Sequence, residues 1–200
     1  LMGTVETAAA LQNVGEFLIA SEEMTPACGW YYSTWLDALA ASPQMDTLVL
    51  AKLMVDAASI HASIETNSHS AWAITDLKRA DELIQALQKV LEHATPAELV
   101  AGGENTTTMG EREGGYDQYD CLDFWRGADS AQQKLLRDAV QKTVIYQKLS
   151  SPFMAACGLA FYAPLAHRER YEEVRSVLRE LGFQETYFGP YDRIGRNYSE

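Results

Sequence analysis

The fold is decided by residues 4–20, TVETAAALQNVGEFLIA. The first part of this stretch is typical of a helix, because the hydroxyl of Thr4 can cap the first turn and Glu6 puts an acid in that turn. Small apolar residues follow at helical spacing, which predicts a buried helix from Thr4 to about Val14. Gly15 is expected to end this helix.

The second part of the stretch, Phe17–Ala20, is a continuous apolar run. The polar residues 21–23, SEE, follow it at once, and this pattern is typical of a short strand that is covered on both faces. A helix followed directly by a buried strand predicts an α/β fold.

The rest of the chain repeats both patterns. Apolar residues at three- and four-residue spacing predict further helices over 34–41, 47–58, 130–142 and 168–181. Short apolar runs predict strands over 71–74 and 157–162. The clearest helix follows the first of these strands, with Thr75 or Asp76 as its cap and one apolar face made of Leu77, Ala80, Ile84, Leu87 and Leu91.

One segment lacks any periodicity. Residues 102–115 are rich in Gly, Thr, Asn and Glu, which predicts a surface loop. The loop divides the chain into a first unit over 1–101, a loop or linker over 102–128, and a subdomain of helices and strands over 129–200.

The charge of the chain limits its partners. The sequence has 28 acidic and 16 basic side chains, a formal net charge of −12. This field repels phosphate backbones and anionic lipids, so we expect no nucleic acid partner. No apolar run approaches the roughly 20 residues that a membrane helix needs, so we expect no membrane partner either.

The cysteines and the opening of the chain give two further indications. Cys28, Cys121 and Cys157 are odd in number and lack CxxC spacing, which argues against a zinc site or a disulfide framework. The chain also opens almost directly on a helical pattern, which predicts a further piece of the domain upstream of Leu1.

Five segments resemble one known family, in the same order along the chain. Residues 1–8, LMGTVETA, 14–23, VGEFLIASEE, and 29–32, GWYY, are similar to the stretch of clostripain-like (C11 family) cysteine peptidases that follows the catalytic cysteine. Residues 70–77, SAWAITDL, resemble the strand-to-helix junction of that family, and residues 157–164, CGLAFYAP, resemble a later strand.

The resemblance implies a caspase-like (clan CD), three-layer α/β fold. Residues 1–101 would be the C-terminal part of the peptidase domain, and 129–200 a mainly helical lobe that completes it. The resemblance also implies a Cys–His dyad, with the cysteine immediately before Leu1 and the histidine well upstream. Neither catalytic group would then belong to this chain, which would need an N-terminal chain or segment of the same peptidase as its partner.

The same resemblance implies the chemistry and the setting. A thiolate attacks the peptide carbonyl, histidine activates it and protonates the leaving amine, and a backbone N–H stabilises the oxyanion. Gly3 would allow a close backbone approach or an unusual backbone dihedral behind the nucleophile, although a glycine that merely precedes a helix explains it equally well. The implied substrates are polypeptides cut after Arg or Lys, by a secreted or cell-surface bacterial enzyme whose signal would lie upstream and which needs no cofactor.

The candidate substrate-binding residues lie after the first strand. In this fold the loop after Phe17–Ala20 reaches the cleft, and its candidate residues are Glu22, Glu23, Thr25 and Cys28. A basic substrate side chain needs a carboxylate to offset its desolvation, and one aspartate for this is expected upstream. The two glutamates are equally typical of a charged strand exit into water.

Three alternatives remain open on the sequence. A dyad within the chain would pair one of the three cysteines with a histidine, the candidates being His61, His69, His93 and His167. Asp117, Asp120 and Asp123 could hold the calcium that some relatives require, although a solvated loop face explains them as well. The competing function is an inactive, acidic protein-binding module, and the residue before Leu1 would distinguish it from the peptidase.

Overall fold

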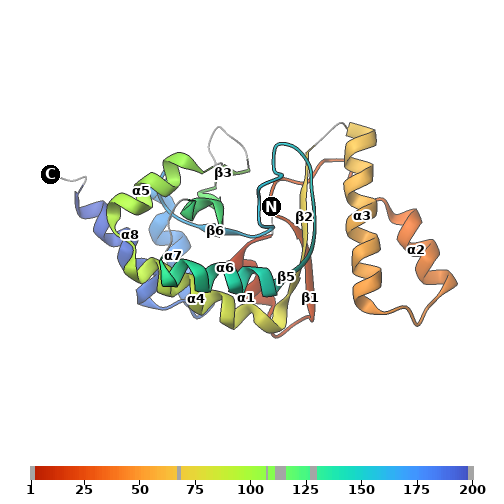
Figure 1. The fold of residues 1–200 in the computed structure, drawn as a ribbon, viewed down its shortest axis with the longest axis horizontal. Helices are drawn as coiled ribbons and strands as arrows, with labels where there is room; N and C mark the ends of the chain where they lie inside the picture. The colour runs from red at the N-terminus through yellow and green to blue at the C-terminus, as the bar shows by residue number, and fades with distance from the viewer. Residues whose placement is uncertain (1–2, 67–68, 107, 111–115, 127–129, 198–200) are drawn as a thin grey trace.

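The computed structural model describes residues 3–66, 69–106, 108–110, 116–126 and 130–197 (Figure 1). The helices are α1 (Val5–Leu11), α2 (Tyr32–Ala41), α3 (Thr47–Thr66), α4 (Ala80–His93), α5 (Pro96–Asn105), α6 (Ala131–Thr143), α7 (Tyr171–Glu180) and α8 (Glu185–Asn197). Short 3-10 helices are η1 (Leu77–Arg79), η2 (Asp123–Trp125) and η3 (Arg168–Arg170). The strands are β1 (Phe17–Ser21), β2 (Ala71–Asp76), β3 (Thr108–Met109), β4 (Gln118–Asp120), β5 (Val144–Leu149) and β6 (Ala160–Tyr162).

The opening helix and strand are confirmed. The hydroxyl of Thr4 accepts a hydrogen bond from the backbone N–H of Thr7 and caps α1. The helix ends at Leu11, earlier than the predicted Val14, because the N–H groups of Val14 and Gly15 both turn back to the carbonyl of Leu11. β1 then begins at Phe17 as expected.

The first sheet has the strand order β1-β2-β5 and is antiparallel throughout. On one face Trp72 and Ile74 of β2 pack in a core with Val55 of α3. On the other face Leu18 of β1 packs with Ala8 of α1 and with residues at the start of α4. Figure 1 shows α3 on one side of these strands and α1, α4 and α6 on the other, which gives the three layers of helix, sheet and helix.

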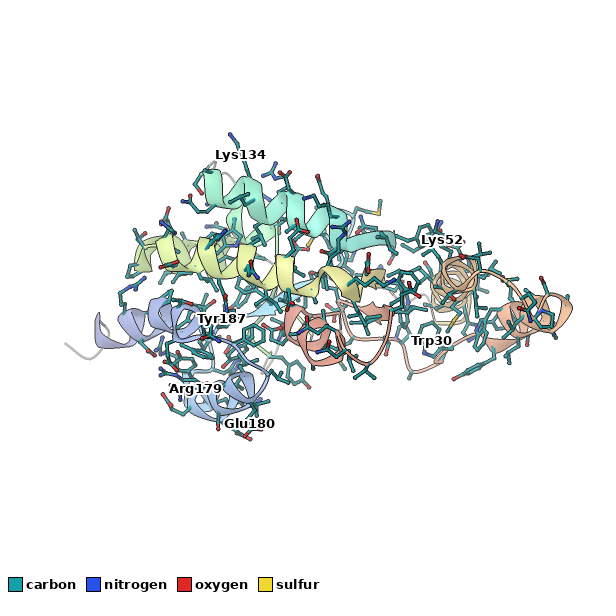
Figure 2. All side chains as sticks on the ribbon, turned by 90° about the horizontal axis from the view of Figure 1, so that it is seen from below. Trp30, Lys52, Lys134, Arg179, Glu180 and Tyr187 are labelled. Atoms are coloured by element: carbon teal, nitrogen blue, oxygen red, sulfur yellow. The ribbon has the colours of Figure 1, made fainter. Side chains whose placement is uncertain are left out.

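The second sheet, β3-β4-β6, borders the largest hydrophobic core. This core joins residues of α4, α6 and α8, among them Leu87, Leu136 and Tyr187 (Figure 2). Each buried side chain of this size contributes about 1.5–3 kcal/mol by leaving water. An isolated parallel bridge between Thr4 and Ala160 links the start of α1 to β6. Gly3 and Thr4 therefore lie between the end of β1 and β6.

The predicted loop over 102–115 is wrong in part. α5 continues to Asn105, and β3 follows at Thr108–Met109, while residues 107 and 111–115 lie outside the described residues. The two glycines that lowered the helical signal are needed for packing. A Cβ on Gly102 would lie 2.5 Å from the Phe124 ring, and one on Gly103 would lie 2.5 Å from Leu165.

Further elements were not expected from the sequence, among them β4 within the predicted linker, β5 and α8. β5 follows α6 without a turn signal, because its first residue, Val144, is also the C-cap of that helix. α8 contains the helix breakers Gly189 and Pro190, yet it forms because Tyr187 and Tyr191 are buried in the main core. The predicted strand over 157–162 begins only at Ala160.

The sequence prediction that no apolar run approaches a membrane span needs correction. Residues Thr47–Ile64 of α3 are long and apolar enough to cross a membrane, by length and composition alone. A helix that packs on a sheet passes the same test, and α3 contacts both β2 and β5. Beside it, the ring of Trp30 packs against that of Trp72 with centroids 4.5 Å apart and planes tilted by 53°. Trp30 lies at the opposite end of the molecule from Arg179 (Figure 2).

Candidate functional site

The first described residue lies at the end of β1. The N–H of Gly3 donates to the carbonyl of Ser21 at 2.9 Å, and the carbonyl of Gly3 accepts from the N–H of Ala160 at 2.8 Å. A Cβ on Gly3 would lie 2.9 Å from both the backbone N of Glu22 and the carbonyl carbon of Ser21. The close backbone approach expected for Gly3 is therefore confirmed, and a side chain does not fit there.

The bond to Ser21 lies on the edge of β1 that faces away from β2. The N–H of Glu22 donates to Ala71 of β2, and backbone groups of successive residues point to opposite edges of a strand. Within the described residues β1 is the edge strand of its sheet. Gly3 therefore lies beside Ser21, the last residue of β1, at the edge of that strand which no other strand covers within the described residues.

Glu22 is fully buried at this strand end, where it joins the two sheets. Its Oε2 accepts from the N–H of Gly158 at 2.9 Å, just before β6 begins. Burial raises the pKa of Glu22 well above its ordinary value, and repulsion by Cys157 and Asp120 raises that pKa further. Gly158 has a φ of +88°, and a Cβ there would lie 2.8 Å from the Cβ of Ala73, so only glycine suits this position.

The other candidate residues of the loop are arranged differently. Glu23 is half-buried and its carboxylate accepts from the N–H of Gly110, next to β3, at 3.0 Å. Thr25 is exposed, and Cys28 is half-buried with its thiol near the carbonyl of Gly29 at 3.9 Å. The structure therefore brings Glu22 and Glu23 to two different partners and leaves Thr25 and Cys28 on the following loop.

Two of the three cysteines of the chain, Cys121 and Cys157, are buried. Burial raises the pKa of Cys121 to about 11 and that of Cys157 well above its ordinary value. Among the described residues, no thiol hydrogen-bonds to a histidine. The ring of His61 lies against Tyr31, and His93 contacts the carbonyl of Lys89.

The three aspartates proposed as calcium ligands serve other partners. Asp117 accepts from the N–H groups of Ala166 and His167 at 2.9 Å each. Asp120 accepts three backbone N–H groups, and Asp123 forms an ion pair with Arg126. The ligand atoms that do gather within 4.8 Å of one another, in the described part of the chain, are those of Glu22, Asp120 and Cys157.

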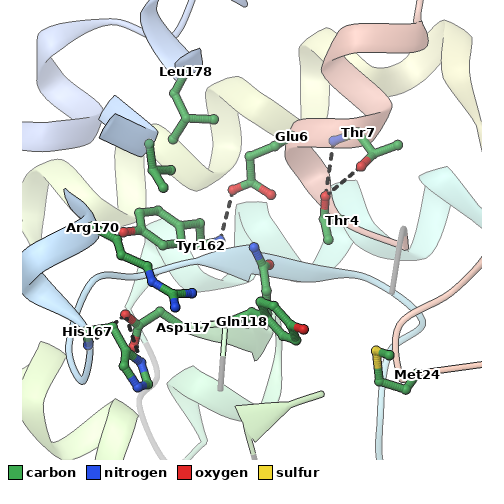
Figure 3. Close-up of a pocket in the computed structure, with 12 residues that line it drawn as sticks. Thr4, Glu6, Thr7, Met24, Asp117, Gln118, Tyr162, His167, Arg170 and Leu178 are labelled. Carbon is green, nitrogen blue, oxygen red and sulfur yellow. Dashed lines mark hydrogen bonds and ion pairs between the residues drawn. The ribbon is translucent and has the colours of Figure 1, made fainter. Parts of the chain in front are cut away.

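A cleft of about 620 Å³ opens beside the start of α1 (Figure 3). Its walls come from α1, the loop after β1, the start of β4, β6 and the segment before α7, and the lining residues include Thr4, Glu6, Met24, Gln118, Tyr162, His167 and Arg170. The sequence did not single out this group, because its members come from segments that lie far apart along the chain. The one available signal was Glu6, an acid inside a run of small apolar residues.

Comparison with solved structures identifies the fold. A clostripain from Bacteroides thetaiotaomicron, in complex with a peptide inhibitor, matches with a TM-score of 0.70 and 16% identity over 94% of this chain and 82% of that one. A cysteine protease from B. fragilis matches with a TM-score of 0.70 and 17% identity, over 94% and 84%. An inactive zymogen of a C11 protease from Parabacteroides distasonis matches with a TM-score of 0.68 and 18% identity, over 92% of this chain and 56% of the zymogen.

These likenesses define a caspase-like α/β fold, that of C11 cysteine proteases. The sequence model of the Clostripain family matches residues 1–154. The chain therefore belongs to the clostripain family. A comparison with curated proteins finds no match.

Proposed function

We propose that this chain is the C-terminal part of a clostripain-like cysteine endopeptidase that cuts peptide bonds after Arg or Lys. The catalytic cysteine lies immediately before Leu1 and the histidine further upstream, so the chain alone is inactive. The observation that carries this proposal is the position of Gly3 at the open edge of β1.

The geometry around Gly3 supports a nucleophile at this point. Active-site residues of α/β folds gather at the carboxyl ends of strands. From Gly3, beside the end of β1, the chain passes through α1 and returns as β1 itself. A parallel strand that ends just before Gly3 would complete a strand–helix–strand unit and cover the open edge. The last residue of that strand would stand close to the exit of β1.

The proposed chemistry uses this placement. The thiolate attacks the scissile carbonyl and forms a C–S bond, and the amine leaves with a proton from histidine before water hydrolyses the thioester. Backbone N–H groups at the strand end stabilise the oxyanion. This chain contributes the close-packed turn at Gly3 and the strand exit that face the substrate, and no metal cofactor is proposed.

The proposed substrate-binding loop keeps Glu22, Glu23, Thr25 and Cys28. The full burial of Glu22 supports a role in holding the base of the loop, which makes Glu23 the better candidate for contact with a basic side chain. In the assembled enzyme, Glu23→Gln should lower kcat/KM for Arg substrates about tenfold or more, as expected for a charged hydrogen bond. Equal and negligible effects of Glu22→Gln and Glu23→Gln would remove both from the pocket.

The decisive experiment is complementation. The purified 200-residue chain should not hydrolyse an Arg or Lys peptide amide, whereas the chain joined to its upstream part should do so and should be labelled by an acyloxymethyl ketone probe. Labelling should survive replacement of Cys28, Cys121 and Cys157 in a folded variant. Thiol-dependent cleavage by the isolated chain would overturn the proposal, and a residue other than cysteine before Leu1 would favour the inactive binding module.

A further inference from the structure

The cleft beside α1 contains buried polar groups that have no partner. We propose that it is a second binding site, which takes a lysine side chain of a polypeptide with the ammonium group directed to Glu6 and Gln118. The polypeptide nature of the ligand rests on the proposed function, but the site itself requires no catalysis.

Glu6 is the group at the centre of the argument. It is 8% exposed, and its Oε1 accepts from the N–H of Tyr162 at 2.9 Å and from the hydroxyl of Tyr187 at 3.0 Å. Its other oxygen, Oε2, has no partner with good hydrogen-bond geometry among the described residues, although the Thr4 hydroxyl and the backbone of Glu6 itself lie close enough to the carboxylate to lower its pKa. A buried carboxylate oxygen left without a partner is destabilising, because the hydrogen bond that water gave it in the unfolded chain is not replaced. A donor from outside the described chain would remove this destabilisation.

The acidic character of Glu6 indicates that the missing donor is a cation. Among the described residues, no cationic side chain pairs with Glu6, and burial raises its pKa, so its charged form is destabilised until a cation compensates it. Buried charges in proteins are normally paired, so a cation is the ligand group that compensates this carboxylate best. Its neighbour in the cleft, Asp117, is already satisfied by two backbone N–H groups and lies 3.6 Å from His167.

Gln118 supplies a second acceptor on the opposite wall. Its Oε1 is buried without a partner. In Figure 3 the end of the Gln118 side chain lies toward Glu6, with the amide nitrogen as the nearer atom. Protein atoms cover both acceptor oxygens, and Gln118 itself is half-buried at the start of β4. A rotation of the Gln118 side chain is therefore the movement that admits an ammonium group to Glu6.

The rest of the cleft suits the remainder of a lysine residue. Met24, Val174 and Leu178 give apolar wall along which a methylene chain can lie. Arg170 is exposed at the rim, where its guanidinium can donate to a peptide carbonyl, and the buried hydroxyl of Tyr162 has no partner among the described residues. A volume of about 620 Å³ exceeds one side chain, so adjacent backbone fits as well.

The test compares two probes that differ only in charge and shape of the side-chain end. The isotopically labelled 200-residue chain is titrated with N-acetyl-lysine methylamide and with N-acetyl-norleucine methylamide, while the backbone amide signals of Gln118 and Tyr162 are followed by NMR. We expect the lysine probe to bind at least about tenfold more tightly than the norleucine probe. Glu6→Gln and Gln118→Leu should remove most of this difference.

Matched variants distinguish binding in the cleft from general effects of a substitution on the chain. Tyr162→Phe should weaken both probes alike, because the hydroxyl faces the peptide part, whereas Tyr146→Phe removes a hydroxyl that binds Asp56 on the far side of the molecule and should change nothing. Glu92→Gln, on the exposed face of α4, is the control for loss of one charge. Equal binding of the two probes, or no saturable shift in the cleft, would overturn the site.

The source of the lysine is decided with the chain joined to its upstream part. If substrate supplies it, the lysine probe still binds there. If the upstream segment supplies it, the cleft amides already show the bound shifts and the probe is excluded until the basic residues of that segment are replaced by methionine. Because binding is measured without turnover, failure of the site and failure of the proposed peptidase activity give different results.

Discussion

At the scale of single residues, Gly3 and Glu22 are the two positions at the end of β1 that their surroundings restrict most. Gly3 has no room for a side chain against the backbone of Ser21 and Glu22. Glu22 is a buried acid that holds Gly158 at the start of β6. Both act on the same point, where the two sheets meet, so substitutions there should affect the stability of the whole chain.

We expect Gly3→Ala to lower the free energy of unfolding by about 1–3 kcal/mol, because the added Cβ would overlap backbone atoms that cannot move independently. Urea denaturation measures the change. Gly15→Ala is the matched control, since its Cβ would make an ordinary 3.5 Å contact with Leu77. The control should be neutral or raise stability by up to about 1 kcal/mol. Equal effects at the two glycines would contradict the close approach.

The buried Glu22 should make stability depend on pH. The unfolded chain releases the proton of this carboxyl near its ordinary pKa of 4.5, whereas burial raises the pKa in the folded chain. The stability contributed by Glu22 is therefore complete below about pH 4.5 and is lost as pH rises toward the folded pKa.

Glu22→Gln should remove this loss, because an amide can accept from Gly158 and donate toward Asp120 at any pH. The free energy of unfolding of the variant, relative to the parent, should rise between pH 5 and 8, by up to roughly 1.4 kcal/mol for each unit of pKa shift. Denaturation curves at several pH values measure it, with Glu23→Gln as the matched control. If the difference in free energy of unfolding between variant and parent stays constant with pH, Glu22 has the same pKa in the folded and unfolded chain.

At the scale of elements, capping residues can fix the start of a helix that its amino-acid composition does not predict. α5 begins with a full capping box, in which Thr95 accepts from the N–H of Glu98 and Glu98 accepts from the N–H of Thr95. Pro96 then occupies the first turn, where its missing N–H is harmless. These signals outweigh the two glycines at the other end of the helix.

We expect Thr95→Ala to lower the free energy of unfolding by about 1 kcal/mol, the usual loss for an N-cap threonine. Thr186→Ala provides the comparison, because Thr186 lies exposed in α8 and makes no side-chain hydrogen bond in the described structure. Thermal or urea denaturation of both variants gives the result. If the two substitutions proved equivalent, the cap of α5 would contribute nothing in solution.

At the scale of the whole molecule, the open edge of β1 is the feature on which the proposed upstream partner depends. The N–H groups of Ile19 and Ser21 point to that edge, whereas those of Leu18 and Ala20 point to β2. An exposed edge of a sheet invites pairing with another strand. The proposed upstream strand would provide that pairing.

Hydrogen exchange tests this arrangement directly. In the isolated chain, we expect the amide of Ile19 to exchange much faster than that of Ala20. Joining the upstream part should slow exchange at Ile19 by roughly tenfold or more while leaving Ala20 protected in both forms. Unchanged exchange at Ile19 in an active joined enzyme would place the upstream strand elsewhere.

The sequence by itself determined the local elements and the family. The cap at Thr4, the strand at Phe17–Ala20 and the apolar face of the helix after β2 rest on signals only a few residues long, so they could be read directly from the sequence. The first two are confirmed. In the third, Leu77 lies in η1, which Asp76 caps, and Ile84 is only half-buried. Segments that resemble clostripain gave the α/β, caspase-like fold, and the family match over residues 1–154 agrees.

The tertiary structure alone decided what depends on distant partners. α8 is helical despite Gly189 and Pro190 because burial of its aromatic face in the main core outweighs propensity. Glu22 meets Gly158 across 136 positions of sequence, and Glu6 meets Tyr162 across 156. Periodicity and capping report only on neighbours along the chain, so neither the burial of these two carboxylates nor the cleft they help to shape could be derived before the chain was folded.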